Sequence, residues 1–226
     1  MTTILLMILA IAPGIAIGLY IYMKDIREPE PSNLIALSVF CGVLSFFVSI
    51  GIGLLLRRYT HIEEQDVIHQ MIKALVFVGL VEEGSKFLFL RGFLFYNKHF
   101  TQPFDGIVYT VMVGMGFATT ENIVYIINGS GGTALIRMFT AVPAHGVFAV
   151  IMGFFIGEAK VFKTSRFLYS GLALGFAAFL HGFYDYFLFL PSIRGFWIQA
   201  IVALLIMLVL THFAIKLRKD EIIKPD

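Results

Sequence analysis

The sequence is poor in cysteine and in charged residues. Its single cysteine, Cys41, excludes an intrachain disulfide and any metal site built from several thiolates. Charged residues make up 14% of the chain, whereas about 25% is usual in soluble domains. The net charge is only +2 and no basic patch is interleaved with aromatic residues, so we expect no nucleic-acid partner.

Apolar residues are abundant instead, at 58% of the 226 residues. They recur in runs of about 20, the length of helix that spans the hydrocarbon core of a bilayer. A transmembrane β-barrel would need alternating apolar and polar residues, which these continuous runs lack. The sequence therefore predicts an all-α fold, a polytopic transmembrane helical bundle. We expect a single integral membrane domain over residues 1–226, with lipid around it.

Polar and turn-forming segments divide the chain into about seven predicted spans, and an eighth, re-entrant element stays open. The segment at 59–73 is polar enough to form a short amphipathic surface helix or a loop. The predicted spans are residues 3–23, 33–56, 74–96, 105–128, 133–158, 167–190 and 195–217.

Proline and glycine give expectations about packing within these spans. Pro143 predicts a kink or break in the fifth span. Small residues four positions apart predict close contacts between helices. Such pairs are Gly14/Gly18, Gly153/Gly157 and Gly171/Gly175.

The distribution of Lys and Arg predicts the orientation. If the N-terminus lies outside, the loops that face the cytoplasm carry the larger share of these residues. We therefore expect an N-out, C-in topology, against which Arg57 and Arg58 argue. The basic residues assigned to the outer loops are Arg57, Arg58, Lys73, Arg137 and Arg194.

Ionisable residues inside the spans are the main functional signal. Each charge at the centre of a membrane helix costs roughly 2.5–3.5 kcal/mol on the translocon scale. Lys86 lies three positions after Glu83 and four after Glu82, so it neutralises one carboxylate and leaves the other over. The candidate site residues are Glu82, Glu83, Glu121, His145, His181 and Asp185, with Lys86 as a structural ion-pair partner.

The depth of these residues places them together. Adjacent spans run antiparallel. At 1.5 Å per residue, the candidate site residues all fall within roughly 12 Å of one another along the membrane normal. His181 and Asp185, four positions apart, share one helix face. We expect side chains from four spans to line one pocket in the outer half of the membrane.

Carboxylates and imidazoles in a secluded pocket suit the activation of water for hydrolysis. A glutamate acts as general base and then as acid, while a histidine stabilises the oxyanion or supplies a proton. No H-E-x-x-H motif is present, but a metal such as zinc held by His145, His181 and Glu82 stays open. An aspartyl dyad is not expected, because Asp105 lies at the opposite interface from Asp185.

Two other classes of function use the same residues. A proton- or cation-coupled transporter or receptor would use the carboxylates as a relay, although no internal repeat is visible. A scaffold that binds a partner helix would leave the surplus carboxylate unexplained.

The motifs "EEGSK" (82–86), "FATTE" (117–121) and "HGFYD" (181–185), with His145 between the last two, resemble the PrsW family of intramembrane proteases. The opening "IAPGIAIGLYIYMKDIREPEPS" is also similar to that family's first helix and loop. That family is related in turn to the CAAX prenyl proteases. The resemblance covers nearly the whole chain.

This resemblance implies a site-1 protease of the bacterial cell membrane. It would cut a single-pass anti-sigma factor on its outer side in response to envelope stress. Glu82 would be the base and His181 part of the oxyanion site. The chain departs from the CAAX pattern at three positions. It has Glu121 where that family has a His, and Asp185 where that family has an Asn. It also has Lys86, whereas that family has an Arg at the following position.

Overall fold

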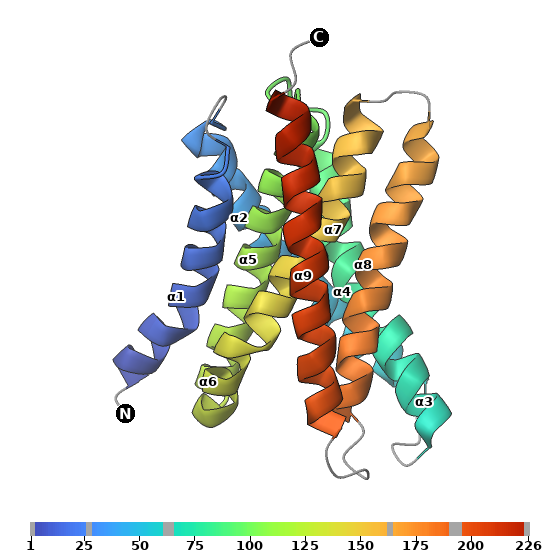
Figure 1. Ribbon diagram of the computed structural model, residues 1–226. Helices are drawn as coiled ribbons and strands as arrows, with labels where there is room; N and C mark the ends of the chain where they lie inside the picture. Colours follow the sequence, from blue (N-terminus) through green and yellow to red (C-terminus); the bar gives the residue numbers. More distant parts are fainter. Residues whose placement is uncertain (1–2, 26–28, 61–65, 162–164, 190–195, 224–226) are drawn as a thin grey trace.

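A computed structural model describes residues 3–25, 29–60, 66–161, 165–189 and 196–223 as an all-helical bundle without strands in these ranges (Figure 1). The predicted all-α fold is therefore confirmed. The helices are α1 (Thr3–Tyr22), α2 (Ser32–Tyr59), α3 (Val67–Ile72), α4 (Val81–Phe89), α5 (Pro103–Ile127), α6 (Gly131–Phe139), α7 (Ala141–Val161), α8 (Arg166–Phe189) and α9 (Phe196–Ile223). Two π-helical segments, η1 (Lys73–Leu80) and η2 (Leu90–Leu94), flank α4.

Five helices of the described chain are long and apolar enough to cross a membrane, namely α1, α2, α5, α7 and α8. The third predicted span falls on the run from α3 to η2, which is divided into short α and π segments and carries the charges of α4. The seventh falls on α9, whose described apolar part is shorter. The chain is thus a multi-pass membrane protein, and the count of about seven spans stays a prediction.

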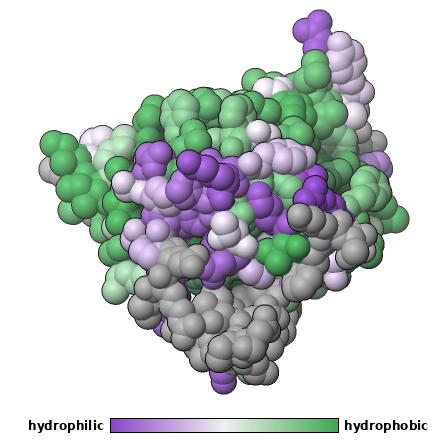
Figure 2. All heavy atoms as spheres, turned by 90° about the horizontal axis from the view of Figure 1, so that it is seen from above, coloured by the Kyte–Doolittle hydropathy of each residue, from purple (hydrophilic) through white to green (hydrophobic). Residues whose placement is uncertain are grey.

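The most buried helices are α5 and α7, which lie at the centre of the bundle, whereas α1 and α2 expose most of their length. Their exposed residues are large and apolar, such as Ile8, Ile15, Phe40 and Leu54, as expected for contact with lipid. On the end face that is uppermost in Figure 1, hydrophilic residues gather toward the middle and hydrophobic residues lie along the rim (Figure 2).

Glycine allows α5 and α7 to cross closely. A Cβ added to Gly106 would lie 2.5 Å from the carbonyl oxygen of Gly153 and 2.6 Å from the amide nitrogen of Gly157. The predicted role of the Gly153/Gly157 pair is confirmed. That of Gly171/Gly175 is wrong, because no other element of the described chain comes within 4 Å of a Cβ there.

The predicted fifth span is broken, and the break lies at Thr140 rather than at the proline. Thr140 has φ −121° and ψ −72°, and it separates α6 from α7. Pro143 occupies the first turn of α7, where a missing N–H costs no helical hydrogen bond. In the predicted surface segment 59–73, residues 66–72 form the N-cap and helix α3, and residues 61–65 lie outside the described ranges.

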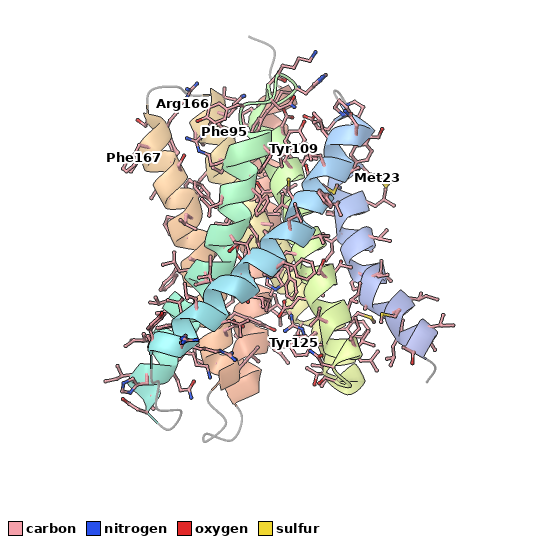
Figure 3. All side chains as sticks on the ribbon, turned by 180° about the vertical axis from the view of Figure 1, so that it is seen from behind. Met23, Phe95, Tyr109, Tyr125, Arg166 and Phe167 are labelled. Carbon is pink, nitrogen blue, oxygen red and sulfur yellow. The ribbon has the colours of Figure 1, made fainter. Side chains whose placement is uncertain are left out.

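The N-terminal end of α1 and the C-terminal end of α9 lie at opposite ends of the bundle (Figure 1). At the end that holds the N-terminus of α1 lies Tyr125, whereas Met23, Phe95, Tyr109 and Arg166 lie toward the other end (Figure 3). Tyr125 lines the polar cavity of about 710 Å³ that is described below. That cavity therefore lies in the half of the bundle where α1 begins, which we call the N-terminal half.

Candidate active site

The two adjacent carboxylates open helix α4, directly after the wide turns of η1. π-Helical turns are rare and occur often at functional sites. A Cβ added to Gly79 on η1 would lie 2.6 Å from the carbonyl oxygen of Ala178 and 2.8 Å from the amide nitrogen of Gly182, both on α8. Glycine at this position therefore lets η1 approach α8 closely, and it brings Glu82 and Glu83 toward His181.

Glu83 connects the buried residues of the site, because it binds both Lys86 and His181. Its side chain is 1% exposed, and its Oε1 accepts hydrogen bonds from Lys86 Nζ at 2.6 Å and from His181 Nδ1 at 2.9 Å. The ammonium of Lys86 also lies 4.0 Å above the ring centroid of Phe117. Lys86 is the only cation on α4, and it pairs with Glu83. Glu82 therefore has no cation on its own helix to pair with.

His145 on α7 joins two of the charged helices. Lysine is only a donor, so the 3.0 Å contact between Lys86 Nζ and His145 Nδ1 makes Nδ1 the acceptor. Nε2 then carries the proton, and it donates to Glu121 Oε2 at 3.1 Å. The geometry therefore favours the neutral Nε2–H tautomer of His145.

Arg137 completes the partners of Glu121, and sequence reasoning missed it. Its Nη2 lies 2.5 Å from Glu121 Oε2, and its guanidinium lies 4.4 Å from the ring centroid of Tyr125. From the sequence, Arg137 counts only among the basic residues of the outer side, and the structure places it on α6, which folds beside α5 and α7. A basic residue within an apolar run was the available signal.

His181 and Asp185 lie on one face of α8. His181 Nε2 is 3.3 Å from Asp185 Oδ2 and 3.8 Å from Glu82 Oε2. The ring stacks on Phe148 with centroids 4.8 Å apart, and its centroid is 4.9 Å from that of His145. The imidazole is thereby held between the buried Glu83 and the more accessible pair of Glu82 and Asp185.

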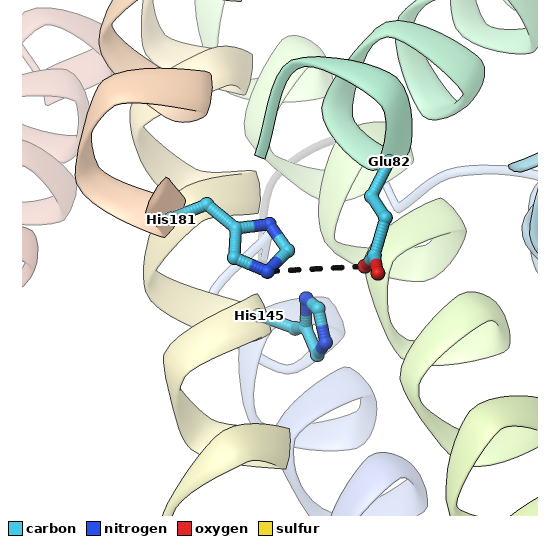
Figure 4. A group of neighbouring side chains, drawn as sticks. All are labelled: Glu82, His145 and His181. Atoms are coloured by element: carbon cyan, nitrogen blue, oxygen red, sulfur yellow. Dashed lines mark ion pairs between the residues drawn. The ribbon is translucent and has the colours of Figure 1, made fainter. Parts of the chain in front are cut away.

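Glu82 faces both imidazoles. Figure 4 shows the side chains of Glu82, His145 and His181 converging from α4, α7 and α8. Glu82 Oε2 is buried and has no hydrogen-bond partner among the described residues. A buried carboxylate oxygen without a donor is costly, so this atom is available for a water, a substrate or a cation.

A cavity of about 710 Å³ connects these groups. It is lined by the accessible members of the cluster and by apolar side chains of α2, η1 and α8. The six predicted site residues therefore come together from four helices. Five of these residues line the cavity, and Glu83 is buried behind them. Those that line the cavity are Glu82, Glu121, His145, His181 and Asp185.

The residues fit a divalent metal. Glu82, His145 and His181 each offer one ligand atom, and these atoms lie within 4.8 Å of one another. Two histidines and one glutamate form a ligand set known from catalytic zinc sites. The bond from His181 Nδ1 to Glu83 is the carboxylate contact that usually supports a ligating histidine, and the orphaned oxygen of Glu82 needs a partner.

Fold and site together define a multi-pass membrane protein with a secluded acid–imidazole centre. A profile of the family described as "PrsW family intramembrane metalloprotease" matches residues 30–213. The chain belongs to this family and is a peptidase of the intramembrane type. A transporter or a non-catalytic scaffold, the alternatives left open by the sequence, gains no support from this match.

Three curated relatives, each named Protease PrsW, show the extent of the similarity. The protein from Clostridioides difficile (strain 630) is 36% identical over 224 residues, which cover 96% of this chain and 90% of the relative. That from Geobacillus kaustophilus (strain HTA426) is 35% identical over 189 residues, covering 83% and 81%. That from Bacillus subtilis (strain 168) is 35% identical over 179 residues, covering 79% and 80%. No solved structure matches the chain.

Proposed function

We propose that the protein hydrolyses a peptide bond of a single-pass membrane protein with water activated by Glu82. The observation that carries the proposal is that no Lys or Arg of the described chain is paired with this carboxylate. Glu83 is paired with Lys86 and Glu121 with Arg137, whereas Glu82 Oε2 has no hydrogen-bond partner among the described residues. It faces the cavity beside both imidazoles.

In the reaction, the carboxylate of Glu82 accepts a proton from the attacking water. The water oxygen then adds to the peptide carbonyl, and Glu82 returns the proton to the leaving amine. The Nε2–H of His181 donates to the developing oxyanion in place of its contact with Asp185, which lies 3.3 Å away, while the bond from Nδ1 to Glu83 holds the ring. His145 keeps its Nε2–H on Glu121 and accepts from Lys86 through Nδ1, so it links these two charged side chains beside the reaction centre.

A metal would be held by Glu82, His145 and His181. One oxygen of Glu82 would bind it, which leaves the other oxygen to accept the proton of the water. His181 would then be a ligand, and polarisation of the carbonyl would pass from its N–H to the metal. When bound, a divalent metal supplies Lewis-acid polarisation of the carbonyl and lowers the pKa of a coordinated water. Treatment of the purified protein with a chelator is expected to abolish cleavage, and added Zn²⁺ is expected to restore it. His145→Ala is expected to reduce the zinc retained after dialysis, measured by mass spectrometry. Full activity in a dialysed sample without metal would contradict this assignment.

We further infer that the substrate is a bacterial membrane-anchored anti-sigma factor, cut near the outer face of the cell membrane. The resemblance of the motifs and the bacterial relatives support this choice. Support for the outer face comes from the predicted N-out, C-in topology and from the position of the cavity in the N-terminal half of the bundle.

The test is co-expression of a candidate anti-sigma factor with wild type, Glu82→Gln and the matched control Glu158→Gln. Glu158 lies about 20 Å along α7 from His145. We expect wild type and Glu158→Gln to release the same fragment on an immunoblot. Glu82→Gln is expected to be slower by about 10²-fold or more, because it cannot accept a proton. Wild-type cleavage by a stably folded Glu82→Gln protein would remove Glu82 from the mechanism.

A further inference from the structure

A second cavity of about 420 Å³ adjoins the site, and we call it the α2–η1 groove. One wall is a face of α2, and the other is a face of the segment from Lys73 to Glu82. The groove and the catalytic cavity share several lining residues, so they adjoin one another at Glu82. The shared residues are Ile50, Arg57, Lys73, Val78 and Glu82.

Helix geometry explains both walls. On α2 the lining residues Ile50, Leu54 and Arg57 recur at intervals of three or four, which places them on one face. On the opposite wall the wide turns of η1 bring Lys73 and Phe77 into line with Glu82. The groove therefore runs from a basic end, at Arg57 and Lys73, to the acidic centre.

The middle of the groove is open. Gly53 lines it, and no described atom of another element lies within 4 Å of a Cβ added there. Beyond it, Leu54 is 63% exposed and Arg57 is also exposed, so the basic end opens to the surroundings of the bundle.

We propose that the α2–η1 groove admits the extended chain of the substrate and that Arg57 and Lys73 bind an acidic side chain of it. This inference rests on the proposed proteolytic function. Lys73 and Glu82 are separated by about 13.5 Å along the helical segment, which is about four residues of an extended chain. The acidic residue should therefore lie about four positions from the scissile bond.

The opposed charges of the two ends support a fixed direction of binding. A substrate carboxylate is repelled near the chemistry by Glu82 and Asp185, since Arg137 neutralises Glu121, and it is attracted by the cations at the other end. Sliding of the chain by several residues would bring the acid toward the carboxylates. The charge pattern thus selects both an acidic substrate and its register.

The space of the groove is tested with a glycine pair. Gly53→Phe fills the groove, whereas Gly51→Phe adds the same side chain at a position outside both cavities that is also open within 4 Å. We expect at least tenfold loss of cleavage for Gly53→Phe and wild-type cleavage for Gly51→Phe, with equal thermal unfolding midpoints. Equal cleavage by the two variants would overturn the groove as the entry path.

The charge is tested with an arginine pair in proteoliposomes of phosphatidylcholine alone. A library of peptides, each an apolar segment joined to a polar one, is cleaved by wild type and the products are identified by mass spectrometry. The peptide cleaved fastest is then synthesised with Asp, Asn or Lys at each of the six positions on either side of the cut, a range that includes the position about four residues away. Arg57→Glu is compared with Arg58→Glu, whose side chain lines neither cavity.

For wild type and Arg58→Glu we expect Asp about four positions from the cut to lower KM about tenfold relative to Lys, with kcat unchanged. Arg57→Glu should reverse this preference, and Arg57→Lys should retain it. If peptides are cleaved but Arg57→Glu keeps the wild-type preference, the inference fails and the proposed function stands. The inference also fails, and the function again stands, if the effect appears only when anionic lipid is added. If wild type cleaves no peptide with Zn²⁺ present, the proposed function fails and the inference with it.

Discussion

His181 Nδ1 lies 2.9 Å from Glu83 Oε1, and this bond joins α8 to α4 across 98 positions of the chain. The same carboxylate oxygen accepts from Lys86 Nζ at 2.6 Å. Glu83 is 1% exposed and therefore depends on these donors for its solvation. The pair of adjacent glutamates is thus divided, with Glu83 holding the helices together and Glu82 facing the cavity.

This division predicts a stability effect. Lys86→Met should destabilise the protein by about 3–5 kcal/mol, because it leaves a buried carboxylate without its cation. The double variant Glu83→Gln/Lys86→Met removes both charges and should recover much of that loss. Reversible unfolding in mixed micelles measures the free energies. A single variant as stable as wild type would show that the ion pair does not support the fold.

The sequence predicted much of this arrangement, and the rest depended on details that spacing does not contain. The depth argument placed the carboxylates and imidazoles at one level, and the structure brings them to one cavity. Spacing alone allowed Lys86 to pair with either Glu82 or Glu83. The choice depends on how the π-helical turns of η1 rotate α4, and a pattern based on 3.6 residues per turn does not reveal such turns.

Arg137 shows a second limit of the sequence. A proline pattern predicted a break at Pro143, but the chain breaks at Thr140, so α6 is a separate short helix. Its position over the cavity follows from tertiary packing beside Tyr125, with which the guanidinium makes a cation–π contact at 4.4 Å. A residue that the sequence used only to predict orientation therefore becomes part of the site.

Arg137 gives the second prediction. Arg137→Met removes the guanidinium that lies 2.5 Å from Glu121 Oε2 and adds one unbalanced negative charge to the cavity. Because an oxyanion develops there, we expect kcat to fall about 10–100-fold with a smaller change in KM. Arg166→Met, at the opposite end of the bundle (Figure 3), is the matched control and should keep wild-type kinetics. Equal kcat for the two variants would exclude an electrostatic role.

A pH effect on stability is predicted at the other end of the bundle, in the loop between α1 and α2. The pKa of Glu30 is raised from 4.5 to about 7, mainly by burial. The bond from the Tyr109 hydroxyl opposes this rise, and the nearby charges of Asp105 and Asp25 add to it. Between these values the folded protein holds a proton that the unfolded chain has lost. Stability from this group is therefore fully present below pH 4.5 and is lost as the pH rises through about 7.

Glu30→Gln tests this effect, because the amide oxygen still accepts from Tyr109 but does not titrate. We expect the variant to be more stable than wild type at pH 8 by about 1–3 kcal/mol and similar to it near pH 4. Thermal unfolding midpoints at a series of pH values measure the difference. Parallel curves for the two proteins from pH 4 to 8 would contradict the prediction.

The last prediction concerns the glycines around the two glutamates. Gly79→Ala would place a Cβ 2.6 Å from the carbonyl oxygen of Ala178, and because the obstacle is backbone, η1 must move away from α8. That shift separates Glu83 from His181, so we expect at least a tenfold loss of cleavage. Gly84→Ala is the matched control on α4, since no described atom of another element lies within 4 Å of its Cβ and alanine favours a helix by about 0.5–1 kcal/mol. A Gly79→Ala protein as active as Gly84→Ala would show that close packing of η1 on α8 does not position the site.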